Sequence, residues 1–149
     1  MKTIVAAVDF SNSTPGVIDM AVSMAQRFHT SLHLFHTVEP QPAYTAYGFT
    51  PDEFPAMNVY QNEALRRAKR HMEHLHSKVA LELPDVVSEL VEGSPLHQLC
   101  DYVKKSGADL VILGSHGHGV MASLLLGSVA EGMVRKAAVP VLIIPAEKE

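Results

Sequence analysis

The chain has 149 residues, of which 47% are hydrophobic and 19% are charged, so it is long and apolar enough to bury the core of one domain. A disordered chain would carry fewer apolar residues and more charge. The formal net charge of −4 argues against a nucleic-acid binder, which needs a basic face, and against docking on an anionic membrane.

Cysteine usage and the lengths of the apolar runs bear on the compartment. Cys100 is the single cysteine, so no intramolecular disulfide can form, which suits a reducing compartment. Its apolar neighbours Leu96, Leu99 and Val103 predict a buried, unreactive thiol. The five apolar residues before Asp9 are too few for a signal peptide, and no apolar run approaches the ~18 residues of a membrane span. We expect a cytoplasmic protein without membrane insertion.

Strands and helices alternate from the start of the chain. Ile4–Val8 is an apolar run without alternation, which predicts a strand buried on both faces of a parallel sheet. A polar turn and Pro15 introduce a helix, whose apolar residues recur at helical spacing between 17 and 28. Leu32–Val38 is the second predicted strand. The pattern then stops over residues 39–58, and this predicted loop is either a functional lid or a variable surface excursion.

The second half of the chain continues the alternation. A helix is predicted around residues 64–79, and Val86–Val91, with a polar residue on each face, predicts a strand at the edge of the sheet. The elements that follow are a helix over Leu96–Lys105, a strand over Leu110–Leu113, a glycine-rich turn over Gly114–Gly119, a helix over Leu124–Ala137 and a last strand over Val139–Ile144. Together they predict a single-domain α/β fold, with a parallel sheet and helices on both faces.

The glycine-rich turn carries the main candidate site. Three glycines between 114 and 119 let the backbone turn tightly after a buried strand, so that successive N–H groups can form an anion-binding nest. Gly127 and Ser128 lie at the start of the next helix, where unpaired N–H groups and the helix dipole favour a phosphate. The sequence contains neither a Walker P-loop nor a dinucleotide fingerprint after the first strand. We therefore predict a phosphate site of a different type.

The spacing Gly114-x2-Gly117-x9-Gly127-Ser128 resembles the ATP-binding signature of the universal stress protein family. The resemblance covers nearly the whole chain: the opening strand that ends in Asp9, the turn at 91–95, the strand at 108–114 and the ending at 140–145. It implies a Rossmann-like, adenine nucleotide alpha-hydrolase-like domain over residues 1–149. Its five parallel strands would follow the order 3-2-1-4-5.

The resemblance also implies ATP across the strand ends, as in the nucleotide-binding branch of the family. Independently of the resemblance, a magnesium ion held chiefly by the nucleotide is expected to bridge its phosphates. Asp9 would lie near the adenosine and Val38 against the base or ribose. The residues expected to bind the cofactor are Val8, Asp9, Val38, Leu113, Gly114, His116, Gly117, Gly127, Ser128 and Val129. Ala130 stands where ATP-binding relatives often have a threonine, so one phosphate donor is missing.

Some of these residues have a second interpretation. Asp9 could cap the following helix instead of binding a ligand. His116 could be an exposed turn residue, and we expect His118 to face solvent. His71 and His74 could share a helix face, but no third metal ligand is evident, so a solvated surface is favoured over a zinc site. His33 and His36 should face opposite sides of their strand.

Efficient catalysis has little support. Phosphoryl transfer needs positive charge at the γ-phosphate, but no lysine or arginine occurs between Gly114 and Ser128. We assign no catalytic residue and expect slow ATP hydrolysis at most. Three hypotheses remain: a nucleotide-sensing regulatory protein read by an unknown regulatory partner, an enzyme that cleaves ATP at the α-phosphate, and an interaction protein with an empty site.

The last predicted strand, Val139–Ile144, is apolar and uncharged, so an open edge there would promote aggregation. Pairing with the same strand of a second copy would remove that edge and form a two-fold homodimer, which the family resemblance also implies. The alternative is that a helix of the same chain covers the edge.

Overall fold

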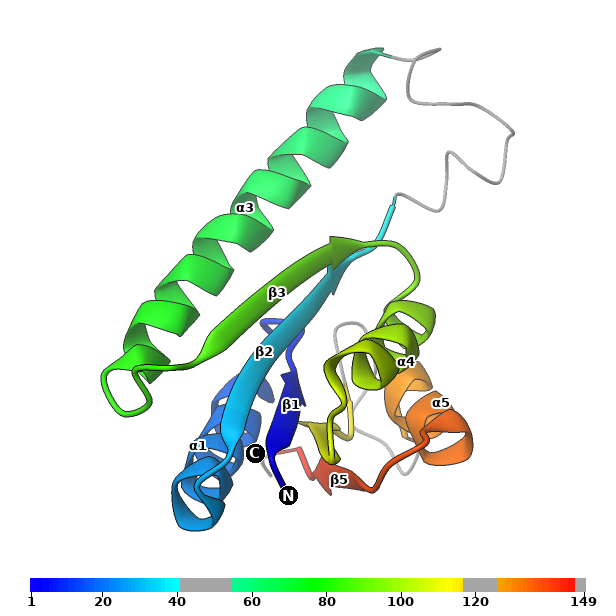
Figure 1. Ribbon diagram of the computed structural model, residues 1–149. Coiled ribbons are helices and arrows are strands. Elements are labelled where there is room, and N and C mark those ends of the chain that lie inside the picture. Colours follow the sequence, from blue (N-terminus) through cyan, green and yellow to red (C-terminus); the bar gives the residue numbers. More distant parts are fainter. Residues whose placement is uncertain (41–54, 117–125, 147–149) are drawn as a thin grey trace.

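The computed structural model describes residues 1–40, 55–116 and 126–146. Five parallel strands form one sheet in the order β3-β2-β1-β4-β5 (Figure 1). The strands are β1 (Thr3–Ala7), β2 (Ser31–Val38), β3 (Val87–Glu92), β4 (Leu110–Gly114) and β5 (Val141–Ile144). This arrangement confirms the predicted fold class, and it places β3 at one edge of the sheet, as its polar pattern predicted.

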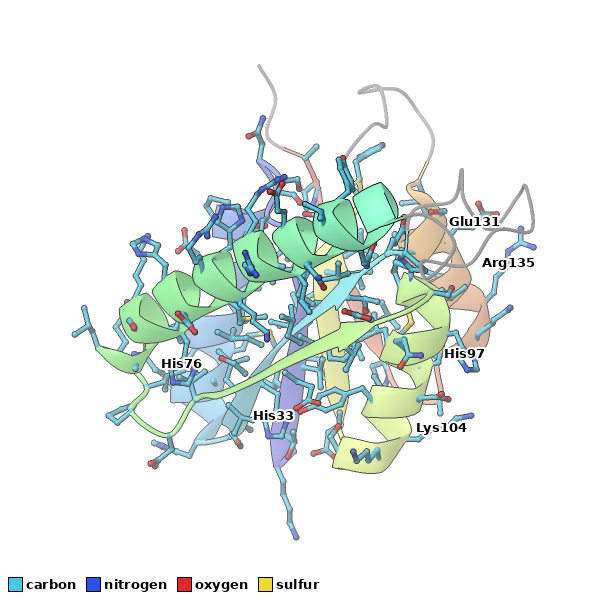
Figure 2. All side chains as sticks on the ribbon, turned by 90° about the horizontal axis from the view of Figure 1, so that it is seen from above. His33, His76, His97, Lys104, Glu131 and Arg135 are labelled. Atoms are coloured by element: carbon cyan, nitrogen blue, oxygen red, sulfur yellow. The ribbon has the colours of Figure 1, made fainter. Side chains whose placement is uncertain are left out.

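Helices cover both faces of the sheet (Figure 1). The helices are α1 (Thr14–Phe28), α3 (Pro55–Ala80), α4 (Pro95–Ser106) and α5 (Ser128–Lys136). The first two cover one face, and α4 and α5 cover the other. The outer surfaces of α4 and α5 are polar: His97 and Lys104 stand on α4, and Glu131 and Arg135 on α5 form an exposed ion pair at 2.9 Å (Figure 2).

The core lies on the two faces of β1 and β4. Ile4, Val5 and Ala6 are fully buried, and because successive side chains alternate, Val5 faces the α4 and α5 layer while its two neighbours face the α1 layer. The prediction of a strand buried on both faces is therefore confirmed.

The single cysteine, Cys100, is half-buried rather than buried as predicted, and its Sγ atom lies 3.7 Å from the Sδ atom of Met133.

Two predicted element starts are wrong, each for a local reason. The predicted helix over Leu124–Ala137 begins at Ser128, because Gly127 is extended (φ −62°, ψ 158°) and acts as the N-cap. The predicted strand over Val139–Ile144 begins at Val141. Its preceding residue is a proline, which has no N–H to donate to the sheet.

The predicted loop over residues 39–58 is shorter at its far end. Helix α3 begins at Pro55, and proline is favoured in the first turn of a helix because its missing N–H would have no partner there. Residues 41–54 of that loop lie outside the described residues, so its role as a lid or an excursion stays open. The helix predicted around residues 64–79 therefore begins nine residues earlier than expected. The remaining strand boundaries differ by one residue; β3, for example, covers Val87–Glu92 instead of Val86–Val91.

Candidate functional site

A cavity of about 430 Å³ lies at the carboxyl ends of β1, β2 and β4. This volume falls within the ~300–1,000 Å³ that is usual for small-molecule sites. The connections that leave β1 and β4 run to opposite faces of the sheet, and ligands of open α/β sheets bind where the strand order reverses in this way.

The structure brings the predicted site residues together around this cavity. The described ones that line it are Val8, Asp9, Val38, Leu113, Gly114, His116, Gly127, Ser128 and Val129. The remaining two loop predictions, for Gly117 and His118, lie outside the described residues.

The amino end of α5 borders the cavity. The carbonyl of Gly127 accepts the N–H of Glu131 at 2.9 Å, which is the first hydrogen bond of the helix. The N–H groups of residues 128–130 precede that bond and so have no acceptor within the helix. These residues line the cavity, so the positive end of the helix dipole lies beside it. The arrangement suits an anion such as phosphate.

Hydrogen bonds fix both sides of the loop at its base. The N–H of Gly127 donates to the carbonyl of Ser115 at 2.7 Å, so this N–H is already used within the protein. Ser115 is buried, its own N–H donates to the carbonyl of Ile144 at 2.8 Å, and its Oγ accepts the N–H of Ala146 at 3.1 Å. Ser115 therefore holds together the end of β4, the end of β5 and the start of α5.

Gly114 has a packing role that the sequence does not reveal. A Cβ atom at this position would lie 2.7 Å from the Oγ and 3.0 Å from the Cβ of Ser13, below the usual contact distances. The end of β4 thus passes close to the start of α1. The hydroxyl of Ser13 also donates a long hydrogen bond, 3.4 Å, to the carbonyl of His116. A glycine is needed here for close packing whether or not a ligand is bound.

Asp9 shapes the turn that leads into α1. Its Oδ1 atom accepts the N–H of Ser11 at 2.9 Å, although the N-cap of the helix is Ser13. The alternative interpretation is thus modified: Asp9 stabilises the turn before the helix and also lines the cavity. Phe10, which follows it, has a positive φ of 59°, an uncommon conformation for an aromatic residue that often marks functional turns.

Histidines of β2 face both layers, as predicted. The Nδ1 atom of His36 lies 2.7 Å from the carbonyl oxygen of Val8, and because a carbonyl only accepts, Nδ1 carries the proton. The His36 ring also lies 4.5 Å from the ring of Phe10 and lines the cavity. On the other face, the Nδ1 atom of His33 is 2.9 Å from the hydroxyl of Tyr102. Sequence reasoning did not assign His36 to the site.

Two threonines that line the cavity carry a hydroxyl that solvent does not reach. The Oγ1 atoms of Thr14 and Thr37 are buried without a partner in the described part of the chain, and both residues line the cavity. Unsatisfied buried polar atoms are rare in native proteins, where they call for an explanation. Neither threonine was among the predicted cofactor-binding residues, although Thr37 directly precedes Val38, which was.

The electrostatics of the cavity come from helix ends and carboxylates. Asp9 and Glu39 line it, whereas none of the described lining residues is a lysine or an arginine. Positive potential at this site must therefore come from the amino ends of α1, α4 and α5, whose first residues lie around the cavity.

Neither a metal site nor a membrane-spanning helix is found among the residues that the structure describes. Among them, no group of three or more His, Cys, Asp or Glu side chains is placed to hold a metal ion, and His71 and His74 lie exposed on α3. Within the same part of the chain, no helix is both long and apolar enough to cross a membrane.

Residues 1–145 match the sequence model that describes the Universal stress protein family. The chain belongs to the universal stress protein family. A relative from Thermus aquaticus is 30% identical, over 96% of this chain and 98% of its own. The solved structure of UspA from Lactobacillus plantarum is 28% identical, with a TM-score of 0.84, and the match covers 96% of this chain and 97% of that one.

Two more distant family structures were solved with nucleotides. The universal stress protein from Archaeoglobus fulgidus in complex with dAMP is 22% identical, with a TM-score of 0.66 and coverage of 97% and 98%. A universal stress protein in complex with cAMP is 23% identical, with a TM-score of 0.62 and coverage of 98% of both chains. At this identity the likeness to this chain is one of fold.

Proposed function

We propose that this family member is a nucleotide-binding regulatory protein that holds ATP in the cavity at the strand ends. The main support for the proposal is the amino end of α5, because it offers phosphates N–H groups that have no acceptor within the helix, together with the positive end of the helix dipole. The family structures with dAMP and cAMP make an adenine nucleotide the natural class of ligand.

The walls of the cavity fit a nucleotide lying across the sheet. In this proposal the phosphates lie at α5, beside β4, and the adenosine extends past Asp9 toward Val38 at the end of β2. Apolar side chains from both layers, such as Val17 of α1 and Leu99 of α4, border the cavity and can bury a base or a ribose. This orientation follows the order of the strands, because β1 lies between β4 and β2.

The charge of the cavity favours holding ATP over cleaving it. No lysine or arginine is found among the described residues that line it. A magnesium ion bound to the phosphates would offset part of their charge, and we propose that it enters with the nucleotide. Ala130 in the first turn of α5 offers no hydroxyl to a phosphate. We therefore propose slow hydrolysis at most, without an efficient catalytic residue.

Titration calorimetry with ATP and magnesium tests the proposal directly. At an ATP concentration 100 times Kd, binding should stabilise the fold by about 2.7 kcal/mol. For a chain of this size, that corresponds to an increase in Tm of roughly 5–10 °C. No heat and no Tm change at millimolar ATP would refute the proposal. Rapid formation of ADP or AMP would instead favour the hydrolytic enzyme.

Ser128 allows a test in which stability and binding change in opposite directions. It is exposed at the start of α5 and lines the cavity. In the Ser128→Glu variant, a carboxylate should stabilise the helix end by ~0.3–1 kcal/mol but repel phosphate. We expect at least a tenfold loss of ATP affinity, while Ser128→Gln, of matched size without the charge, keeps most of it. Equal affinity of the two variants would contradict the phosphate assignment.

We also propose that the protein forms a homodimer through β5, the second edge of the sheet. The carbonyls of Pro140 and Ile144 accept N–H groups from the β4 side. By alternation, the main-chain groups of Val141 and Ile143 point to the open edge, where a second copy could pair. Light scattering should then give twice the mass of the chain. Ile143→Pro, which removes an edge N–H, should yield monomers, whereas Ile143→Ala should remain dimeric.

A regulatory role requires that a partner distinguishes the ATP-bound from the free protein. In this proposal, ATP shifts the population toward one conformation of the surface around the cavity. The partner is proposed to be a protein, whose identity the site does not specify. Dimers that bind no nucleotide at any concentration would favour the interaction protein with an empty site.

A further inference from the structure

The buried side chains described on helix α3 all lie in its carboxyl-terminal half. Met72 and Val79 are buried there, and the ring of His71 lies 5.2 Å from the ring of Phe10, in the turn that follows β1. Toward the amino end the helix becomes exposed, and the accessible fraction is 51% at Tyr60. Figure 1 shows this end of α3 projecting beyond the carboxyl ends of the strands. Such a segment, with few buried contacts, opens more readily than the core of a protein.

The side of α3 that faces the rest of the protein changes in size where the helix passes the cavity. The described residues of α3 that line the cavity are Ala64 and Ala68. Farther along the helix, the inward residues are Met72, Leu75 and Val79, which pack in the core. The two alanines lie about one helical turn apart, roughly 6 Å along the axis. They form a flat apolar strip, and larger side chains at these positions would occupy the space of the cavity.

Side chains at the end of β2 border the same part of the cavity. Leu34 is buried in the layer formed by α1 and α3, so by alternation His36 and Val38 face that layer as well. The ring contacts agree, because Phe10 lies 4.5 Å from the ring of His36 and 5.2 Å from the ring of His71 on α3. Both His36 and Val38 line the cavity. At this end, the cavity is therefore bordered by β2 and by the alanine strip of α3.

This border suits a flat aromatic ring better than a phosphate. The amino end of α5 follows β4, and β2 is two strands away in the order β2-β1-β4. When a nucleotide has its phosphates at α5, its base is the part that extends farthest from them. Alanine and valine side chains can bury the faces of a base, as apolar groups do in most ligand pockets.

We propose that the adenine base of the bound nucleotide packs between Val38 of β2 and the strip of Ala64 and Ala68 on α3. This assignment rests on the proposed function and extends it to a helix that was not predicted to contact the ligand. The base then bridges the sheet and the amino-terminal half of α3, where few of the described side chains are buried. Nucleotide binding therefore restrains this half of α3, and its mobility differs between the free and the bound protein.

A leucine on either side of the helix tests the contact. Ala64→Leu keeps a good helix former but fills the space of the base, so we expect it to lower ATP affinity at least about tenfold. Inorganic tripolyphosphate, which has no base, should bind this variant as tightly as it binds the wild type. Asn62→Leu is the matched control, because Asn62 is exposed and does not line the cavity. Residues two apart on a helix do not face each other, so this variant should keep both affinities.

Hydrogen exchange of the wild type measures the restraint on α3. With ATP bound, the amides of residues 59–68 should exchange about tenfold more slowly than in the free protein, and those at the start of α5 should also be protected. Tripolyphosphate should protect the start of α5 and leave the exchange of residues 59–68 unchanged, because it does not reach α3.

Several results would overturn the assignment. Ala64→Leu could bind ATP as tightly as Asn62→Leu, or it could lose ATP and tripolyphosphate binding to the same extent. The wild type could bind ATP without any protection of residues 59–68, or tripolyphosphate could protect them equally. A wild type that binds tripolyphosphate but not ATP would also overturn it. A wild type that binds neither probe would refute the proposed function itself, and the assignment with it.

Discussion

Replacing Gly114 by alanine tests why a glycine begins the loop. If it were there only so that a ligand can approach, Gly114→Ala would leave the free protein as stable as before. The structure predicts a clash in the free protein instead, because the added Cβ would lie 2.7 Å from the Oγ and 3.0 Å from the Cβ of Ser13. The carbonyl of His116, at 3.3 Å, limits movement away from that contact.

The size of the effect follows from two opposing terms. Overpacking costs ~1–3 kcal/mol. Gly114 does not have a positive φ, so alanine can adopt its backbone conformation and recovers ~0.4–1 kcal/mol from the unfolded state. We expect a net loss of about 1–2 kcal/mol, which corresponds to a decrease in Tm of roughly 2–8 °C.

A second substitution identifies the cause of that loss. Ser13 forms no side-chain cap with α1, so Ser13→Gly alone should cost only a few tenths of a kcal/mol. Combined with Gly114→Ala, it removes the atoms in the clash and should restore most of the stability. Urea unfolding of the wild type, the single variants and the double variant gives the coupling energy, expected at about 1 kcal/mol or more. Simple additivity of the two substitutions would refute the reasoning.

Three further predictions concern pH and backbone strain. Hydrogen bonds from the N–H groups of Lys2 and Thr3 hold the pKa of Asp109 below its usual value. The ionised Asp109 carboxylate therefore stabilises the fold above pH ~4, and this stabilisation is lost as pH falls through the lower pKa of the folded protein. In acid unfolding experiments, the stability of Asp109→Asn should depend less on pH than that of the wild type. Burial lowers the pKa of His33, an effect partly offset by Glu89, so stability should fall as pH drops below ~6.5 and the His33→Gln variant should lose that slope in urea titrations. Gly93→Ala should lower Tm more than Gly107→Ala. Both glycines have a positive φ, but of the two only Gly93 would place a Cβ against a side chain, 2.9 Å from the Nε2 atom of Gln98. Equal decreases in Tm would contradict this account.

The fold could be predicted because its signals are local. The unbroken apolar run at Ile4–Val8 indicates a strand in the middle of a parallel sheet, and the β-α alternation then leaves few topologies. The start of α3 could not be placed in the same way. Pro55 is a start signal, but it is one of several prolines in that part of the sequence, and only the structure identifies which one begins a helix.

The sequence allowed us to predict several of the residues that line the site, but not the individual contacts that those residues make. The glycine spacing and the family resemblance pointed to Gly114, His116, Gly127, Ser128 and Val129, which the fold brings to one cavity. The packing of Gly114 on Ser13 could not be predicted, because these residues are about a hundred positions apart in the sequence. The hydrogen bond from the N–H of Gly127 to the carbonyl of Ser115 could not be predicted either, because it depends on the extended conformation of Gly127 at the start of α5. Among the described residues the buried hydroxyl of Thr37 has no hydrogen-bond partner, and this is also a property of its surroundings in space that no sequence pattern encodes.

The position of Ser115 links two surfaces of the molecule. Its N–H holds the end of β5, and its carbonyl holds the N-cap of α5, so two consecutive hydrogen bonds connect the sheet edge with the proposed phosphate end of the cavity. In a dimer joined through β5, this chain of bonds would run from each ligand to the interface and on to the other copy. Occupancy of one cavity would then alter the affinity of the other, and the binding isotherm would depart from that of independent sites.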